Sequence, residues 1–296
     1  MKRKGSNYSL EGLVAIITGA SRGLGLAIAQ AYVRAGASIC MCARDAALLQ
    51  QAIEKIEKIA AGQQKIIAQV ADVSNQEDVE KLVQSVIREF SQVHILVNNA
   101  GIYGPIGLVE EADWDAWVMA IKINLLGSVL MCRALLPHFK NHHYGKIVQL
   151  SGGGATSPMP YFSAYAASKA AVVRFIETLA EEVRSDCIDV NALAPGVLNT
   201  RMQDEVLEAS PEKAGSAYYK RMVKVKSQGG ASLDNAANLA VFLGSAASDG
   251  LTGKLISAVW DPWENLPEHL EDLQITDVYT LRRIVPKERG MKWGER

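Results

Sequence analysis

The stretch that most constrains the fold is LVAIITGASRGLG, residues 13–25. It begins with five apolar residues, largely β-branched or bulky, which are typical of a buried strand, and a helical pattern opens at Leu24. Gly19, Gly23 and Gly25 mark the turn. Glycines let a backbone approach a phosphate closely, and the free N–H groups at the start of a helix attract an anion. The stretch therefore predicts a nucleotide-phosphate site, although simple strand-to-helix packing produces similar turns.

Apolar runs of strand length alternate with helical patterns along the rest of the chain. We expect strands over residues 37–42, 66–70, 94–97, 146–150, 188–193 and 255–259, and helices that include residues 24–34, 113–139 and 164–184. Buried strands that alternate with helices are typical of a parallel sheet covered on both faces. With right-handed crossovers, residues 1–260 are predicted to form a single α/β domain, a doubly wound parallel sheet with helices on both faces. Residues 261–296 are expected to form a C-terminal extension.

The composition excludes several kinds of partner. The chain has 296 residues, of which 49% are hydrophobic and 21% charged, and a net charge of -1, so no nucleic-acid partner is expected. The start, MKRKGSNYSLEG, lacks the apolar core of a signal peptide, and no apolar run approaches the ~18 residues of a membrane span. These features predict a cytoplasmic protein without membrane contact. The four cysteines and five histidines have no metal-ligand spacing, so no metal site is expected.

Small or polar residues follow five of the expected strands. They are Ala43 and Arg44; Asp72 and Val73; Asn98, Asn99, Ala100 and Gly101; Ser151 with three glycines; and Pro195 with Gly196. In a doubly wound sheet a ligand binds beyond the carboxyl ends of the strands. Each group could simply end its strand, but together they predict one ligand crevice.

The end of the second expected strand bears on the choice of cofactor. An acidic residue at this place would bond the ribose 2′-hydroxyl of NAD, whereas this chain has Ala43 followed by Arg44. Arg22 lies in the glycine turn, and two guanidinium groups suit a 2′-phosphate. The pattern favours NADP, with NAD as the alternative if the arginines are only surface charges.

Tyr165 and Lys169 lie four residues apart in the helical stretch SAYAASKAAVVRF, which places both side chains on one helix face. A neighbouring ammonium group stabilises a phenolate, so the pKa of Tyr165 is expected to fall. The spacing predicts an acid/base pair or, alternatively, an incidental surface contact.

Taken in order, seven segments of the chain resemble the classical short-chain dehydrogenase/reductase family. They are TGASRGLG (18–25), ADV (71–73), NNAG (98–101), Asn124 in KINLLG, Ser151 after KIVQL, YAASK (165–169) and APGVLNT (194–200). The resemblance implies a Rossmann-like fold and NAD(P)-dependent transfer of a hydride between the nicotinamide and a secondary alcohol or carbonyl substrate. It also implies that Tyr165 is the general acid/base and that Lys169 lowers its pKa and holds the nicotinamide ribose. Ser151 would polarise the carbonyl, and Asn124 would anchor a water molecule of the proton relay.

The same resemblance implies the cofactor contacts. It assigns Gly19, Ser21, Arg22 and Leu24 to the phosphates and adenosine ribose, Asp72 and Val73 to the adenine, Asn99, Ala100 and Gly101 to the ribose, and Pro195, Val197 and Thr200 to the nicotinamide. Arg44 joins this set through the 2′-phosphate argument. The family's subunit contacts imply a homodimer or homotetramer built through the long helices over residues 113–139 and 164–184.

Three departures from the family pattern stand out. His94 replaces an aspartate that often precedes the NNAG strand, which is expected to alter only packing. The expected serine is one position early, because Gly152 lies thirteen residues before Tyr165 and Ser151 fourteen. Flexible glycines could let Ser151 reach the substrate oxygen, or it could merely end its strand. The fallback donors are Thr156, Ser157 and Ser163.

The third departure is the tail, which lacks the usual glycine pair after the last strand. Residues 261–277 carry six acids and no Lys or Arg, residues 282–296 are rich in bases, and Trp260, Trp263 and Trp293 supply large apolar surfaces. A disordered tail does not need three tryptophans. The tail is therefore expected to pack on the body or on a neighbouring subunit, near the substrate mouth.

The sequence does not identify the substrate. Residues 199–230 are expected to cover the nicotinamide end, and residues 213–226 carry five cations and no acid, which fits an anionic substrate group or a solvated helix face. Two other classes of function remain open, an NADP-binding sensor or scaffold and an epimerase or dehydratase. A sensor or scaffold is expected to lack Tyr165 or Lys169, but both are present here. An epimerase or dehydratase usually has a larger C-terminal substrate domain than this chain offers.

Overall fold

The computed structural model describes residues 8–294 of the protein; the first seven residues, which hold the basic start, and residues 295–296 of the predicted extension lie outside this range. Seven strands form one sheet in the order β3-β2-β1-β4-β5-β6-β7, and every neighbouring pair is parallel. The strands are β1 Val14–Thr18, β2 Ser38–Ala43, β3 Ile66–Val70, β4 Ile95–Asn98, β5 Gly145–Leu150, β6 Ile188–Ala194 and β7 Leu255–Ser257. The strand order reverses between β1 and β4, where doubly wound sheets bind their ligands.

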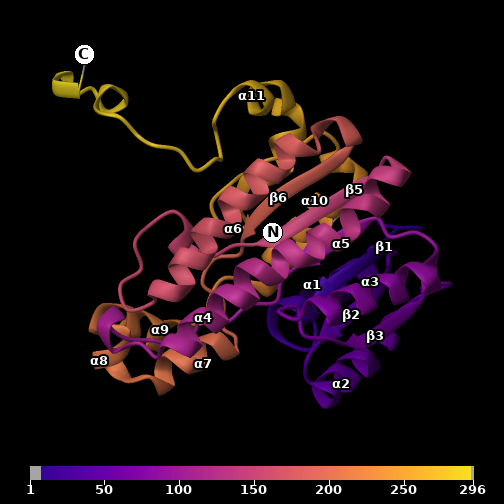
Figure 1. Ribbon diagram of the computed structural model, residues 1–296, viewed down its shortest axis with the longest axis horizontal. Helices are drawn as coiled ribbons and strands as arrows, with labels where there is room; N and C mark the ends of the chain where they lie inside the picture. The colour runs from indigo at the N-terminus through magenta and orange to yellow at the C-terminus, as the bar shows by residue number, and fades with distance from the viewer. Residues whose placement is uncertain (1–7, 295–296) are drawn as a thin grey trace.

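Helices cover both faces of this sheet (Figure 1). One face carries α1 Gly23–Arg34, α2 Ala46–Glu57 and α10 Leu233–Gly244, and the other carries α3 Gln76–Phe90, α5 Gly127–His142 and α6 Ser163–Glu182. The strands divide their side chains between the two cores with a period of two, since Ala15 and Ile17 face one core while Val14 and Ile16 face the other. The predicted Rossmann-like α/β fold is therefore confirmed.

The predicted helix over residues 113–139 is divided into three parts. It consists of α4 Trp114–Ile121, a π-helical turn Lys122–Leu126 and α5, which contains Pro137. π-Helical turns often occur at functional sites, and this one contains Asn124. Among the described residues this is the one helix long and apolar enough to cross a membrane by length and composition, a criterion that buried core helices of soluble proteins also meet.

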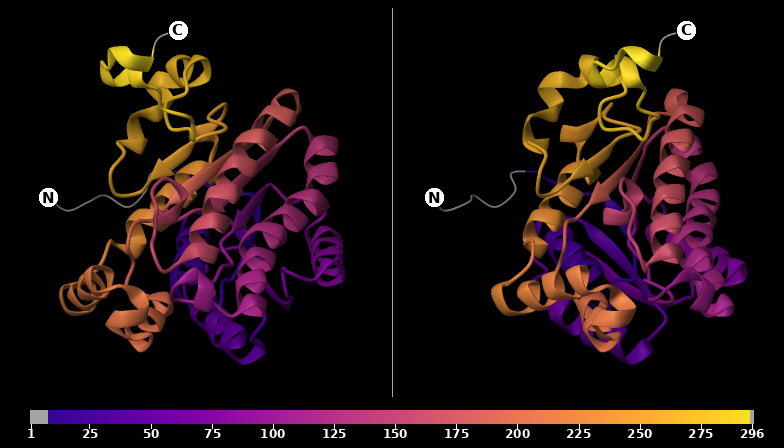
Figure 2. Two further views of the ribbon diagram at one scale, coloured as in Figure 1. Left: turned by 60° about the vertical axis from the view of Figure 1, so that its left-hand side comes forward. Right: turned by 90° about the vertical axis from the view of Figure 1, so that its left-hand side faces the viewer.

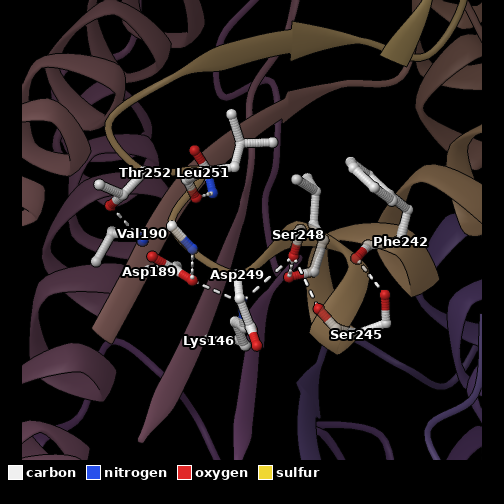
Figure 3. A network of polar contacts seen from close by, with 12 residues as sticks. Lys146, Asp189, Val190, Phe242, Ser245, Ser248, Asp249, Leu251 and Thr252 are labelled. Atoms are coloured by element: carbon white, nitrogen blue, oxygen red, sulfur yellow. Dashed lines mark hydrogen bonds and ion pairs between the residues drawn. The ribbon is translucent and has the colours of Figure 1, made fainter. Parts of the chain in front are cut away.

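An ion-pair network centred on the buried Lys146 lies at the end of the sheet opposite the carboxyl ends of the strands (Figure 3). Lys146 of β5 is buried and contacts Asp189 of β6 and Asp249, each at 2.6 Å. Burial raises the pKa of the Asp189 carboxyl, and the Lys146 ammonium opposes this rise. Nearby, His94 accepts a hydrogen bond from the backbone N–H of Val14 at 3.0 Å, a packing role.

Part of the C-terminal extension packs on the body. Trp263 is only 7% exposed and lies against Phe242 and Tyr8, with ring centroids 5.5 and 6.4 Å apart. The segment then passes through α11 Leu270–Ile275 and bonds to the amino end of β7, where Leu255 N–H donates to Tyr279 C=O at 2.8 Å. The expectation that the tail lies near the substrate mouth holds at its start, where Asp261 lines the cleft beside Trp260. It is wrong for the part that follows, which contacts the amino end of β7 and not the carboxyl ends of the strands. Residues 282–294 extend away from the body (Figures 1 and 2).

Candidate active site

A cleft of about 1930 Å³ opens at the carboxyl ends of the strands. Every residue predicted to bind the cofactor lines it: Gly19, Ser21, Arg22, Leu24, Arg44, Asp72, Val73, Asn99, Ala100, Gly101, Tyr165, Lys169, Pro195, Val197 and Thr200. Ser151 also borders the cleft, whereas Asn124 is buried behind its wall. No group of three or more His, Cys, Asp or Glu side chains in residues 8–294 could hold a metal ion.

The glycine turn is built so tightly that side chains would not fit. A Cβ at Gly25 would lie 2.3 Å from the carbonyl oxygen of Gly19, and a Cβ at Gly19 would lie 2.9 Å from Ala100 Cα. Gly19 and Gly23 also have positive φ angles of 63° and 57°, which other residues rarely adopt. The turn leads directly into α1, so its backbone N–H groups and the helix N-terminus fit a pyrophosphate.

The residues after β4 fix this turn against the sheet. The Asn99 side chain donates to the carbonyl oxygens of Thr18 and Gly19 at 2.9 and 3.1 Å. In return, the Thr18 hydroxyl accepts hydrogen bonds from the backbone N–H groups of Asn99 and Ala100 at 3.0 and 3.1 Å. The ends of β1 and β4 are thereby joined, which holds the floor of the cleft rigid at the switch point.

Asn124 links the loop after β4 to α6. Its side chain accepts from Ile102 N–H and donates to Ile102 C=O, both at 2.9 Å, and also donates to Ser168 Oγ at 2.9 Å. Ser168 in turn donates to the backbone carbonyl of Tyr165 at 2.7 Å. Asn124 therefore fixes the position of the helix that carries Tyr165.

Tyr165 and Lys169 are both buried on the cleft side of α6. The Lys169 ammonium donates to the Leu150 carbonyl at 2.8 Å and lies 5.7 Å from the centre of the Tyr165 ring. Burial lowers the pKa of Lys169 to about 8. Burial raises the pKa of Tyr165, and the neighbouring Tyr218 raises it further. The expected fall in the Tyr165 pKa is therefore wrong for this structure, because desolvation outweighs an ammonium group that bonds to a backbone carbonyl.

The serine position differs from the simplest form of the family pattern. The Ser151 hydroxyl is buried without a hydrogen-bond partner in the described part of the chain, and its backbone N–H donates to Leu193 C=O at 2.8 Å. At the next position, a Cβ on Gly152 would lie 2.2 Å from the Tyr165 hydroxyl oxygen. The phenol thus occupies the space that a side chain at position 152 would fill.

The fallback donors lie elsewhere. Thr156 and Ser157 are exposed at the rim of the cleft. The Ser163 hydroxyl accepts a hydrogen bond from the Trp117 indole at 3.1 Å.

The predictions from sequence missed an apolar end of the cleft. Helices α7 Arg201–Glu208, α8 Ser210–Ala214 and α9 Ser216–Gln228 lie close together (Figures 1 and 2), and residues of all three line the cleft. The cleft-lining side chains that cluster around these helices are mostly aromatic or methionine: Tyr103, Met159, Tyr161, Met202, Tyr218, Met222 and Val225. The only sequence signals for them were the place of Tyr103 just after NNAG and the variable segment 199–230. Such a lining fits an apolar substrate body.

Charged side chains line the cleft both near β2 and β3 and on α7 and α9, including Arg44, Asp72, Glu205 and Arg221. Arg44 is 3.7 Å from Asp72, and both are partly exposed. In the cationic segment over residues 213–226 all five charged side chains are exposed, which fits a solvated face, and Arg221 alone among them borders the cleft. Lys226 pairs with Asp204 of α7 at 2.6 Å.

Comparisons with known proteins agree with this geometry. The short chain dehydrogenase family model matches residues 13–211. An 11-beta-hydroxysteroid dehydrogenase-like 3 of Arabidopsis thaliana is 34% identical over 217 residues, covering 70% of this chain and 69% of that protein. A dehydrogenase/reductase SDR family member 4 of Caenorhabditis elegans is 29% identical over 249 residues, covering 83% and 93%. The chain spans 54% to 69% of the length of three of its curated relatives.

Among solved structures, an NAD+-bound xylitol dehydrogenase is similar with a TM-score of 0.76 and 26% identity, over 83% of this chain and 97% of that one. The family model covers most of the chain, and the matching motifs meet at one cleft. The chain therefore belongs to the short-chain dehydrogenase/reductase family.

Proposed function

We propose that the protein is an NADP-preferring oxidoreductase that interconverts a secondary alcohol and a carbonyl compound. The observation that carries this proposal is the Tyr165–Lys169 pair, which is buried beside a glycine turn that fits a pyrophosphate. A phenol and an ammonium group at the end of a dinucleotide cleft are suited to move a proton at an oxygen atom. The bound nicotinamide would supply or accept the hydride.

Each proposed residue has a defined task. In the reducing direction the substrate carbon gains a hydride and its oxygen gains the Tyr165 proton, which solvent then replaces. The Lys169 ammonium stabilises the phenolate that this transfer leaves behind, and Asn124 holds the π-helical turn and α6 in register for the proton relay. The role of Ser151 stays a prediction, since its hydroxyl is buried without a partner among residues 8–294.

The preference for NADP rests on charge at the end of β2. Ala43 stands where an acid would bond the ribose of NAD, and Arg44 and Arg22 both line the cleft. Guanidinium groups bind phosphate through charge-assisted hydrogen bonds. Binding of NAD remains the alternative, as it is in the similar xylitol dehydrogenase.

We also propose a small-molecule substrate, a cytoplasmic location and a homodimer or homotetramer. Exposed apolar side chains along α4 and the π-helical turn support self-association. Trp114 is 70% exposed and stacks on Trp117, and Met119 and Leu126 are exposed on the same long helix. Apolar surface of this kind is typical of contacts between subunits.

A direct test is to follow NADPH and NADH oxidation with a panel of aliphatic, cyclic, aromatic and steroid ketones and aldehydes. The proposal expects turnover by the wild-type chain with NADPH preferred, and loss of turnover in Tyr165→Phe with cofactor affinity retained. If both cofactors bind and no carbonyl or alcohol is turned over, the result would support an NADP-binding sensor or scaffold instead of an enzyme. Interconversion of epimers without net NADPH oxidation would support the epimerase.

A further inference from the structure

The reacting oxygen lacks an obvious second hydrogen-bond donor beside Tyr165. Ser151 borders the cleft, but its hydroxyl oxygen is buried, and Gly152 has no side chain to offer. The space beside Gly152 is already filled by the Tyr165 phenol. If the protein reduces carbonyl compounds, as proposed above, another group must stabilise the developing charge on oxygen.

Two further phenols lie next to Tyr165. The Tyr103 ring meets the Tyr165 ring edge-on, with centroids 4.8 Å apart. Phe162 supports both phenols from behind, with its ring centroid 5.1 Å from that of Tyr103 and 5.0 Å from that of Tyr218. Tyr103 and Tyr218 both line the cleft, and they belong to the same hydrophobic cluster as Tyr165.

The hydroxyl oxygens of Tyr103 and Tyr218 are 3.5 Å apart. This distance is long for two hydroxyl groups, which usually bond at about 2.7 to 2.8 Å. An acceptor oxygen beside the pair could therefore lie about 2.7 Å from both. Burial raises the pKa of Tyr103, so this phenol stays protonated at neutral pH and can donate. A pair of neutral hydroxyl groups is a known way to stabilise a developing oxyanion.

We propose that Tyr103 and Tyr218 together supply the second donor to the substrate oxygen, in place of the serine. Tyr103 belongs to the rigid loop after β4, whereas Tyr218 belongs to α9. The donor pair is complete only when α9 lies against Phe162, as it does in this structure. The helices over the substrate end therefore contribute to the chemistry as well as to substrate binding.

The test compares Tyr218→Phe and Tyr103→Phe with Tyr219→Phe. Each change removes one hydroxyl and keeps the ring, and Tyr219, whose hydroxyl donates to Leu207 C=O at 3.4 Å, is the matched control on the same helix. With the panel ketone that the wild-type chain reduces fastest, Tyr218→Phe and Tyr103→Phe should each lower kcat by about 100-fold and raise KM by about tenfold. Tyr219→Phe should keep the wild-type kcat. Ser151→Ala should lose less than Tyr218→Phe.

A second readout does not require turnover. Affinity of the same ketone for the protein saturated with NADP+ is measured by calorimetry, and Tyr218→Phe should weaken it about tenfold, the effect of one hydrogen bond. Thermal unfolding of the variants checks that the fold is kept. If Tyr218→Phe keeps the wild-type kcat, or if only Ser151→Ala lowers kcat by about 100-fold, Tyr103 and Tyr218 do not donate to the substrate oxygen. Either result leaves the proposed oxidoreductase function in place. A chain that neither reduces nor binds any panel carbonyl overturns both.

Discussion

Gly152→Ala tests whether the phenol of Tyr165 must occupy the space above Gly152. The added Cβ would lie 2.2 Å from the phenol oxygen and 3.0 Å from Cζ, whereas real Cβ contacts essentially never fall below 3.0 Å. Gly152 has an extended backbone with φ -168°, which alanine adopts freely, so the conflict is with the phenol alone. The phenol oxygen must therefore move by about 1 Å, a displacement that can lower the rate of a positioned reaction by about 100-fold.

The assay is steady-state reduction of the best panel ketone, together with direct measurement of NADPH affinity. Gly152→Ala should lower kcat by about 100-fold, because the acid moves relative to the substrate oxygen, while NADPH affinity stays within about twofold. Gly153→Ala is the matched control, since a Cβ at Gly153 meets nothing within 4 Å. If Gly152→Ala retains wild-type kcat, the position of the phenol above Gly152 is not required for catalysis.

Three further predictions follow from burial and charge. Lys169→Met should be more stable than the wild type at pH 7 by about 3 kcal/mol, because burial lowers the pKa of Lys169 to about 8 and the charged amine destabilises the folded state below that pH. This difference in unfolding free energy should disappear between pH 8 and 10.5 when denaturant unfolding is measured at several pH values. A difference that does not change with pH would contradict the lowered pKa of Lys169. Replacing Arg44 and Arg22 by Gln should weaken NADPH binding by about 10- to 100-fold and leave NADH nearly unchanged in fluorescence titrations, whereas equal weakening of both would count against NADP preference. Trp263→Ala should lower the free energy of unfolding by about 3 kcal/mol. Trp293→Ala, at a position that is 78% exposed, should leave it unchanged. Similar losses in the two variants would refute the idea that the extension packs on the body through Trp263.

Most of the fold could be predicted because the central strands β1, β4 and β5 are buried on both faces along their whole length. An apolar run such as Leu13 to Ile17, in a chain where such runs alternate with helices, is stable as a strand of a parallel sheet that helices cover on both faces. The π-helical turn could not be predicted, since an inserted residue leaves the apolar character of residues 113–139 unchanged and shows only in the hydrogen bonds. The place of the extension also depends on long-range contacts, such as Trp263 with Phe242.

The cofactor half of the site was more predictable than the substrate half for a topological reason. Parallel strands bring their carboxyl ends together, so residues such as Asp72 and Asn99 can be grouped by their positions at strand ends in the sequence. Tyr103 and Tyr218 are 115 positions apart, and no rule of strand order joins a loop to α9. The predicted fall in the pKa of Tyr165 was wrong, because a spacing of four residues indicates proximity to Lys169 but gives no information on how far the phenol is desolvated.

The end of β5, more than α6, sets the geometry of the acid/base pair. Lys169 bonds to the carbonyl of Leu150, and two residues later Gly152 leaves the space that the Tyr165 phenol fills. A change at either strand position must therefore move the charge or the acid. The apolar side chains of α7 to α9, such as Val206 and Met222, share a hydrophobic cluster with Tyr165. The contacts with β5 are made by Lys169 and by the Tyr165 phenol itself. Substitutions among the apolar side chains of α7 to α9 should consequently change mainly which carbonyl compound fits, with a smaller effect on the acid/base pair.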